Sequence, residues 1–535
     1  MSQTVGIRPL CLLILGVLLL MLSPVYGQVK ATGAKTGSSQ AQDTSKKRSA
    51  KKLTIGVDEA VKLATTYNSS LRVAYYNHLI DRTSVSEAEA IFEPTLNLAA
   101  NYGADEGVFP SIFPTGQLNP DGTPQFFQAI VTDSSDVGGF SAGVKGLFPT
   151  GATYEMQIRS NYRNNARGGL INPSFQTSTS VAFTQPILRN AWMQYNYANI
   201  RLARYAESQS RQRYRRDVLS TIQAVHTAYW NYVFSIKDLT VKRRSLELAN
   251  KLLEINRVKV ETGVFAPIEI ASAESGVATR VTDVLIAENE IENNADQLRR
   301  LIMTFKDREE WDIQIIPSDD IAEVTFDTPN LDECIDIALS ERPDLAESRL
   351  SLRTQDINLA VADNELLPRV DVVASVNFTG LNTAVGNSFL DSYGVVGAET
   401  WNLGVTLEIP LGNRAARARI SRTRLQRNQA LMAYRDLQLT AVEEVRRAYR
   451  DVEIADKTSH SQKKAMELKL EELKNERIKL DNKVSTNFQV LEIESDLANA
   501  KSEFIRALVQ YRIALSSLAN AMGSSQRVLK WAPRR

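Results

Sequence analysis

The chain has 535 residues, which is more than a single domain of ordinary size contains. Its 63 Lys and Arg residues and 62 Asp and Glu residues leave a formal net charge of +1, which gives no support for a nucleic-acid-binding protein. Of the two cysteines, Cys11 lies in a predicted signal segment, so only Cys334 is expected in the mature chain. We therefore expect a protein without intramolecular disulfides, stabilised by packing.

The N-terminus has the features of a secretory signal peptide over residues 1–27. Arg8 is the only charged residue there, and an apolar run from Leu10 to Leu22 precedes the predicted cleavage site. This run is shorter than the roughly 20 residues of a membrane-spanning helix; an uncleaved membrane anchor is the alternative. Residues 28–52 are predicted to be a disordered linker, whose lysines either contact anionic lipid or peptidoglycan or form a solvated tail.

Two copies of one helical pattern dominate the chain. From Phe488 to Met522, large side chains recur at alternating steps of four and three and so form a stripe along one face of the helix. The same stripe recurs 220 residues upstream, where Ile270 corresponds to Val490 and where Val281 is a further member. A 3.5-residue period over about five heptads predicts helices that supercoil against partners. Each run follows a long helix, predicted from about residue 197 to 261 and from 415 to 481. On the second long helix a seam of small residues is spaced by four and three: Ala441, Val445, Ala448, Val452 and Ala455. We therefore predict two antiparallel helical hairpins, over residues 196–303 and 414–522.

A second repeat divides the chain into two halves. Asp58 and Glu59 correspond to Asp332 and Glu333, and Pro94 corresponds to Pro368 in the same way. The predicted first half spans residues 53–303 and the second half spans residues 331–523. Residues 304–330 carry no long period and are interpreted as a connector packed outside the helices, and residues 524–535 form a C-terminal tail.

Strand patterns follow the first helix of each half. After Pro94 and Pro368 the apolar period changes from 3.6 to 2, which predicts strands within residues 95–187 and 370–410. Pro186 and Pro410 mark the return to helix, because proline suits the boundary between a helix and a strand. The alternation of apolar and polar residues fits an outer-membrane barrel, although an ordinary half-buried sheet gives the same pattern.

The predicted connections between strands differ in length. Residues 103–137 and 379–398 are rich in Gly, Pro, Asn and Phe and are predicted to be long loops, whereas residues 149–151 form a short turn. Four to six strands per chain are too few to close a membrane barrel, which needs about eight, and open edges are not tolerated in lipid. Several chains are therefore expected to build one barrel.

The turns of the two hairpins carry the candidate functional residues. Gly263 can adopt positive φ and end a helix, Pro267 suits the first helical position, and Thr486 with Gln489 fits a capping box. The simpler interpretation of Glu269 and Gln489 is helix capping. The functional interpretation is that acidic residues just inside the tips narrow and select a pore entrance; these are Glu269 and Glu492.

Five segments together resemble the TolC-like outer membrane efflux protein family, over nearly all of the mature chain. They are LDECIDIALSERPDL (Leu331–Leu345), NELLPRVDVVASV (Asn364–Val376), QPIL (Gln185–Leu188), LEIPLGN (Leu407–Asn413) and VLEIESDLANAKSEFIRALVQYRIALSSLANAMG (Val490–Gly523). The resemblance implies mixed α and β structure, in which long helical hairpins form an α-barrel tunnel and strands contribute to a shared transmembrane β-barrel. It further implies a homotrimer in the cell outer membrane, with the helices in the periplasm.

The resemblance also implies a function and partners. The chain would be the exit duct of a tripartite efflux or type I secretion system, with its hairpin tips docked on a periplasmic adaptor protein that is linked to an inner-membrane pump. In the family the tip turn has Gly and, six residues later, an acidic residue, which Gly263 and Glu269 match. The second tip departs from this pattern, because Lys483 stands at the Gly position and Gln489 at the acidic position, while Glu492 matches a further acidic position.

Competing functions find less support in the sequence. Residues 139–143 match the Gly-x-Ser-x-Gly motif of hydrolases but lie within a strand pattern rather than at a strand-to-helix turn. His78, His226 and His460 are scattered over helical stretches, so we predict no enzyme activity, metal site or cofactor. The alternative function is a secreted periplasmic coiled-coil scaffold without a pore, which explains the hairpins but not the two sets of strands.

Overall fold

The computed structural model describes residues 52–165, 170–264, 266–303, 311, 313–321, 330–394, 397–482 and 484–524. The predicted signal peptide, nearly all of the linker, most of the connector, most of the C-terminal tail and Lys483 therefore lie outside the described residues. Across the described part of the chain, no helix combines the length and apolar character needed to cross a membrane.

Each half begins with a pair of helices. The first half has α2 (Val57–Tyr67) and α3 (Ser69–Glu89), and the second has α7 (Leu331–Glu341) and α8 (Pro343–Glu365). Asn68 separates α2 from α3, and its side chain accepts a hydrogen bond from the Leu71 N–H at 3.1 Å. Asparagine is among the best N-cap residues, so this contact starts α3, while the extended backbone of Asn68 ends α2.

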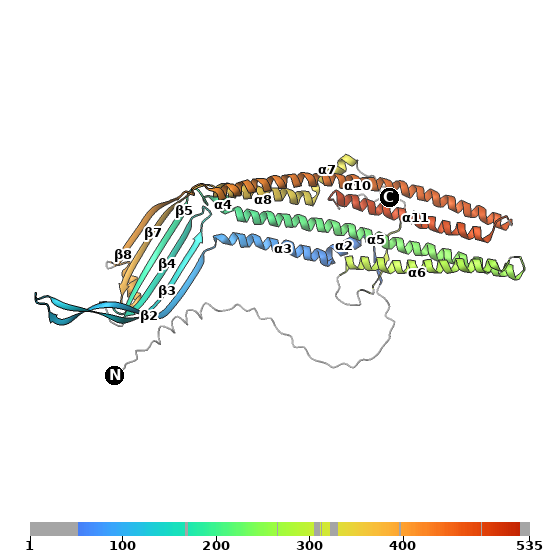
Figure 1. Cartoon of the computed structure of the whole chain (residues 1–535). Coiled ribbons are helices and arrows are strands. Elements are labelled where there is room, and N and C mark those ends of the chain that lie inside the picture. Colours follow the sequence, from blue (N-terminus) through green and yellow to red (C-terminus); the bar gives the residue numbers. More distant parts are fainter. Residues whose placement is uncertain are drawn as a thin grey trace, which may run out of the picture. The chain divides into compact units, whose positions relative to one another are not determined.

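Two long helices and their returning partners make up most of the fold. The long helices have 64 and 68 residues, or about 100 Å at 1.5 Å per residue. Each turns back into an antiparallel helix of 35 residues, and the two hairpins lie side by side (Figure 1). The four helices are α5 (Ala198–Glu261), α6 (Ile268–Ile302), α10 (Arg414–Asp481) and α11 (Asn487–Ala521).

The predicted apolar stripes pack these helices together, with one correction. On α11 the predicted Val490, Leu497, Leu508 and Leu515 are buried, and the small-residue seam of α10 packs against Leu515 and Leu518. On α6 the prediction is wrong near the tip, where Val281 is exposed and the neighbouring Arg280 is buried. Arginine can occupy this apolar seam because its three hydrogen bonds, described below, satisfy the guanidinium.

A six-stranded antiparallel sheet follows α3 and α8 in the chain. Its strand order is β2-β3-β4-β5-β7-β8, which leaves β2 and β8 as its edges. The strands are β2 (Thr95–Leu118), β3 (Pro124–Leu147), β4 (Thr153–Asn165), β5 (Ser174–Pro186), β7 (Arg369–Asn382) and β8 (Ala398–Glu408). The count of six settles the range of four to six that the sequence left open. Two short helices join strands to helices: η1 (Ala90–Phe92) before β2 and α4 (Met193–Asn196) after β5.

The structure corrects both predicted long loops. Residues 103–118 and 124–137 continue β2 and β3 as one long hairpin, whose tight turn includes Gly122 at φ 81°. Pro110 and Pro114 made this segment resemble a loop, but they lie in an edge strand, where a missing N–H is tolerated. The second predicted loop contains a helix, α9 (Val385–Ser392), between β7 and β8.

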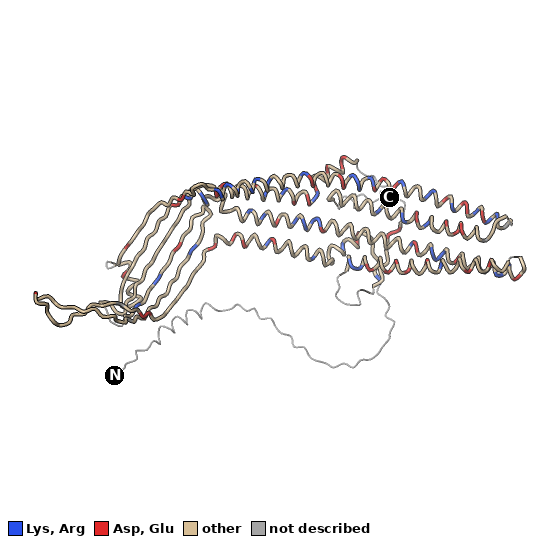
Figure 2. Tube along the Cα trace, viewed as in Figure 1, with Lys and Arg blue, Asp and Glu red and all other residues tan. Residues whose placement is uncertain are grey.

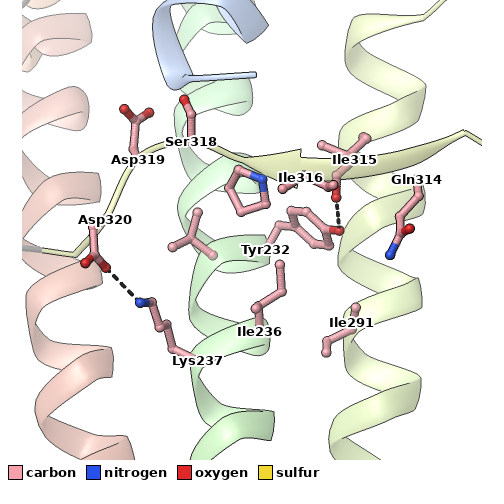
Figure 3. A pocket seen from close by; sticks show the side chains of 12 residues that line it. Tyr232, Ile236, Lys237, Ile291, Gln314, Ile315, Ile316, Ser318, Asp319 and Asp320 are labelled. Atoms are coloured by element: carbon pink, nitrogen blue, oxygen red, sulfur yellow. Dashed lines mark hydrogen bonds and ion pairs between the residues drawn. The ribbon is translucent and has the colours of Figure 1, made fainter. Parts of the chain in front are cut away.

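The connector between the halves also contributes a strand. β6 (Gln314–Pro317) pairs in parallel with β1 (Lys52–Ile55), a small sheet that the sequence patterns did not predict. Figure 3 shows β6 crossing the helices beside a cavity of about 530 Å³. Tyr232 of α5 donates a hydrogen bond to the Ile315 carbonyl at 2.7 Å, and Lys237 pairs with Asp320 at 2.8 Å (Figure 3). The described part of the connector is thus fixed against α5.

Candidate functional site in the sheet and at the hairpin tips

The strand register separates the sheet into an apolar face and a polar face. Residues paired directly across an antiparallel ladder share one face, so each row of paired residues reports the character of that face. One row across all six strands is apolar: Leu96, Val144, Met156, Val181, Val376 and Trp401. The adjacent row, on the other face, is polar or small: Asn97, Gly143, Gln157, Ser180, Asn377 and Thr400. Many side chains of the apolar face remain exposed, with Trp401 at 74% and Leu98 at 67%, whereas Val144, Val181 and Val376 are half-buried.

Aromatic side chains border the apolar face at both ends. At the end away from the helices, Tyr162 stacks with Tyr102 at 6.4 Å and lies 5.1 Å from Phe175. At the helix end, Tyr154 lies 4.8 Å from Phe148, and its ring covers Gly146, where a Cβ would meet the tyrosine hydroxyl at 2.4 Å. Tyr154 and Tyr162 lie about 26 Å apart along β4, or about 20 Å in height for a tilt near 40°, which approximates the apolar band of a membrane barrel.

Charged residues are rare on the apolar face between these aromatic rows: among the paired strand residues, only Glu399 of β8, opposite Phe378, lies there. The charged residues of β4 alternate onto the polar face: Glu155, Arg159 and Arg163. Figure 2 shows charges distributed densely along the helices and sparsely over the strands. Apolar surface of this height, with a single charged residue at the edge strand β8, is suited to contact with lipid hydrocarbon.

The four predicted boundary prolines lie at junctions between helical segments and strands. Pro94 stands between η1 and β2, Pro368 between α8 and β7, Pro186 at the end of β5, and Pro410 two residues after β8. Asn413 reinforces one junction, because its side-chain amide donates a hydrogen bond to the Leu366 carbonyl at 3.0 Å. The structure shows that these prolines lie at the boundaries between helices and strands, and any functional role for them stays a prediction.

The first hairpin tip is closed by Gly263. Its φ of 73° lies in the left-handed region, and its N–H bonds to the Val260 carbonyl at 2.9 Å while the Val264 N–H bonds to the Lys259 carbonyl at 2.8 Å. These are the two hydrogen bonds of a Schellman motif, which ends α5. Pro267 directly precedes α6 with helical dihedral angles.

Glu269 does not form a capping box at this tip. It lies in the first turn of α6, but the N-cap residue is Pro267, which has no N–H for the carboxylate to accept. Its remaining contribution is negative charge at the helix N-terminus, where the helix dipole favours an anion.

The second hairpin tip is closed by a polar network. Thr486 accepts a hydrogen bond from the Gln489 N–H at 3.4 Å, and Gln489 Oε1 accepts from the Thr486 N–H at 3.2 Å, so the predicted capping box forms. Ser485 hydrogen-bonds both Gln489 and the buried Glu476. The Ser485 hydroxyl, followed by Lys479, lowers the pKa of Glu476. A neutral Gln489 avoids a second carboxylate beside Glu476, which gives a physical reason for the departure from an acidic residue.

The structure adds Arg280, which sequence reasoning did not identify. Arg280 is 8% exposed and its guanidinium donates to the Ser245 hydroxyl at 3.2 Å, the Gly276 carbonyl at 3.0 Å and the Leu491 carbonyl at 3.1 Å. Leu491 belongs to α11 and packs between Ala249 and Leu252 of α5. This cluster joins the two hairpins close to their tips. The sequence feature that could have indicated Arg280 was its position directly before Val281, a residue of the predicted apolar stripe.

Ion pairs within each hairpin preserve the internal repeat. Arg257 pairs with Glu274 at 2.9 Å, and the corresponding Arg477 pairs with Glu494 at 2.6 Å. Both pairs join the two helices of one hairpin near its turn. They stabilise each hairpin itself. The cluster of Arg280 and Leu491 joins the two hairpins near their tips, and hydrogen bonds from Ser502 to Asp238 and from Gln223 to Ser517 join them farther from the tips.

The residues considered for catalysis or metal binding do not assemble into a site. Ser141 of the Gly-x-Ser-x-Gly segment lies within β3, paired with Ala99 and Arg159. The three histidines lie apart on α3, α5 and α10, and burial lowers the pKa of His226. Among the described residues there is no group of three His, Cys, Asp or Glu side chains suited to a metal ion.

Comparison with known proteins identifies relatives among outer membrane proteins. The chain is 24% identical over 254 residues to the pyoverdine export outer membrane protein OpmQ of Pseudomonas aeruginosa, covering 46% of this chain and 50% of that protein. It is 22% identical over 261 residues to the outer membrane protein TolC of Vibrio cholerae, covering 48% of this chain and 56% of that protein. The matched region thus spans only about half of each relative.

Solved structures share the whole architecture. The outer membrane channel CmeC of Campylobacter jejuni superposes with a TM-score of 0.63 at 16% identity, covering 94% of this chain and 96% of that chain. This likeness confirms the predicted mixed α and β fold. The model of the family described as outer membrane efflux protein matches residues 145–302 and 334–524, one segment in each half. The family is one of transport proteins, in agreement with the prediction of no enzyme activity. The chain therefore belongs to the outer membrane efflux protein family.

Proposed function

We propose that three copies of this chain close one β-barrel and act as a passive exit duct through the outer membrane. The observation that carries the proposal is the apolar face, which continues across all six strands and ends at two open edges, β2 and β8. Unpaired strand edges are not tolerated in lipid, so β2 of one copy is expected to pair with β8 of the next. Channels of the family are trimeric in known structures, which supports three copies and hence 18 strands.

The proposed barrel has a wide interior. Eighteen strands spaced about 4.8 Å apart and tilted near 40° have a circumference of roughly 113 Å and a backbone diameter of about 36 Å. The lumen is lined by the polar face, as in the row through Asn97, Gln157 and Asn377. Only four of the six strands connect directly to helical segments, because β3 and β4 are joined by a short turn. The helical part is therefore expected to be narrower than the barrel and to limit passage.

The hairpin tips form the proposed periplasmic entrance. Acidic side chains at the tips, Glu269 and Glu492, would favour cations at this entrance. The Arg280 guanidinium and Leu491 hold the two hairpins of one chain together near their tips, so we expect opening of the tips to break this contact. Gly263, Pro267, Thr486 and Gln489 shape the turns that would meet a periplasmic adaptor protein.

Energy for export would come from partners. The duct has no proposed reaction of its own, and the family resemblance supports docking on a periplasmic adaptor protein linked to an inner-membrane pump. The name of the OpmQ relative refers to pyoverdine export, which supports small molecules as one class of cargo. Proteins exported by a type I secretion system are the other proposed class.

Single-channel conductance in a planar lipid bilayer tests this function, together with the oligomer mass of the purified chain in detergent. We expect discrete conductance steps and the mass of a trimer that resists unfolding in detergent. A monomer without conductance would overturn the duct and leave the pore-free scaffold as the better hypothesis.

A further inference from the structure

The apolar face of the sheet is interrupted at one row near its outer aromatic border. In this row Ser160 pairs with Thr177, which pairs with Gly380. Two hydroxyl groups and a glycine thus stand side by side here, whereas the next row carries one hydroxyl group, that of Thr179, between Ile158 and Phe378. Hydroxyl groups facing lipid without a partner are unfavourable, so this row needs a cover.

Helix α9 covers the interruption. Ser388 is fully buried, and its hydroxyl lies 2.6 Å from the Thr177 hydroxyl, which lies 2.9 Å from that of Ser160. A Cβ on Gly380 would lie 2.1 Å from the Ser388 carbonyl oxygen, so glycine is required for the helix backbone to approach. Ser392 is also buried, at 3% exposure. The polar side of α9 is therefore matched to the polar row of the sheet.

The opposite side of α9 is apolar and uncovered in the chain. Leu390 is 68% exposed and Tyr393 is 51% exposed, and the Tyr393 ring lies 5.4 Å from that of Phe389 and 5.3 Å from that of Phe378. The sole charged residue of α9, Asp391, accepts a hydrogen bond from the Asn382 amide at 2.7 Å. These aromatic rings continue the apolar face outward.

We propose that α9 is an interfacial helix that contacts lipid at the outer boundary of the hydrocarbon region, through Phe389, Leu390 and Tyr393. This inference rests on the proposed function, because it requires the apolar face to meet lipid. The occupant is lipid rather than another protein, because α9 lies between the row of Ile158 and the outer aromatic row of Tyr162, on the same face. Aromatic side chains favour this depth, where one end of the ring is apolar and the other meets water.

Spin labels on single cysteines test the proposal in the full chain, with Cys11→Ala and Cys334→Ala as background. The protein is reconstituted in vesicles of phosphatidylethanolamine and phosphatidylglycerol, and the collision of each label with oxygen and with a water-soluble nickel chelate is measured. Leu390→Cys reports α9, while matched labels on one strand, Val405→Cys and Asn402→Cys, report the apolar and polar faces.

We expect the Val405 label to collide with oxygen and to be shielded from nickel, and the Asn402 label to be accessible to nickel. The Leu390 label should be shielded from nickel several-fold relative to the Asn402 label and lie shallower than the Val405 label. Equal nickel access at Leu390 and Asn402, or shielding of Leu390 from both reagents, would overturn the interfacial helix while leaving the duct intact. Nickel access at Val405 would instead overturn the membrane face and the proposed function with it.

A second variant tests whether the sheet holds α9 in place. Gly380→Val introduces side-chain atoms where the α9 backbone approaches, so it should raise nickel access at the Leu390 label. The Val405 label should keep its lipid contact, which shows that the barrel still folds. An unchanged Leu390 label in Gly380→Val would contradict the docking of α9 on this row.

Discussion

Replacing Arg280 with alanine should make the hairpin tips open more easily. Arg280 is the buried cation that reaches from α6 to the Leu491 carbonyl of α11, and it also bonds Ser245 of α5. Alanine removes all three hydrogen bonds of the guanidinium and leaves the Ser245 hydroxyl without this partner. Near the tips, the contact between the hairpins is then reduced to the packing of Leu491 against Ala249 and Leu252.

The size of the effect follows from the one hydrogen bond of Arg280 that crosses between the hairpins. A hydrogen bond from a charged donor contributes about 1.5–3 kcal/mol. If opening breaks the bond to Leu491, its loss in Arg280→Ala should raise the equilibrium constant for opening by roughly ten- to hundredfold in each chain, since about 1.4 kcal/mol corresponds to a factor of ten. The bonds to Ser245 and Gly276 remain within one hairpin and should not contribute to this difference.

Single-channel recording in planar bilayers measures the effect as open probability at fixed voltage. Arg257→Ala is the matched control, because Arg257 also lies near the tip but pairs with Glu274 inside one hairpin, with the two side chains 56% and 52% exposed. Exposed pairs contribute roughly 0.2–1 kcal/mol, so this control should change open probability little. Equal open probability in Arg280→Ala, Arg257→Ala and the unmodified protein would refute the role of Arg280.

Four further changes at the tips have expected outcomes. Gln489→Glu should place a second carboxylate beside Glu476 and speed amide hydrogen exchange of the second tip at pH 7, and acidification should reverse the effect. Folding lowers the pKa of Glu476, so the ionised carboxylate stabilises the second tip at pH values above its ordinary pKa near 4.5. This stabilisation is lost as the pH falls through the lowered pKa. In the unmodified protein, amide exchange of this tip, corrected for intrinsic rates, should therefore rise below about pH 4.5. Gly263→Ala should destabilise the first tip by about 1–2 kcal/mol in the same assay, owing to its φ of 73°. Glu269→Gln with Glu492→Gln should weaken block of the conductance by divalent cations, whereas unchanged block would exclude these carboxylates from the entrance.

The helical part of the fold could be predicted in detail because its signals are local and repeated. A sustained 3.5-residue period predicted both returning helices. The capping box of Thr486 and Gln489 was also readable, since it joins residues three apart in the chain.

The errors fell where structure depends on distant neighbours. Pro110 and Pro114 suggested a loop, although an edge strand tolerates proline, and edge position depends on the topology of the whole sheet. Helix α9 could not be foreseen because it depends on Gly380 and Thr177, which lie on two different strands. Arg280 was missed for the same reason, since its partner Leu491 lies 211 residues away in the sequence.

The central claim is that β2 of one chain pairs with β8 of the next to close a barrel of three chains. Disulfide cross-linking tests this pairing directly, with one cysteine introduced on each edge strand, for example Asn101→Cys on β2 and Asn402→Cys on β8. The position of the cysteine on β8 is then moved along the strand to find the register of the pairing. These edges lie at opposite ends of the six-stranded sheet in one chain. We expect oxidation to give covalent dimers and a ladder that stops at the trimer. Cross-links that are absent at every register, or a ladder that continues beyond three chains, would contradict the account.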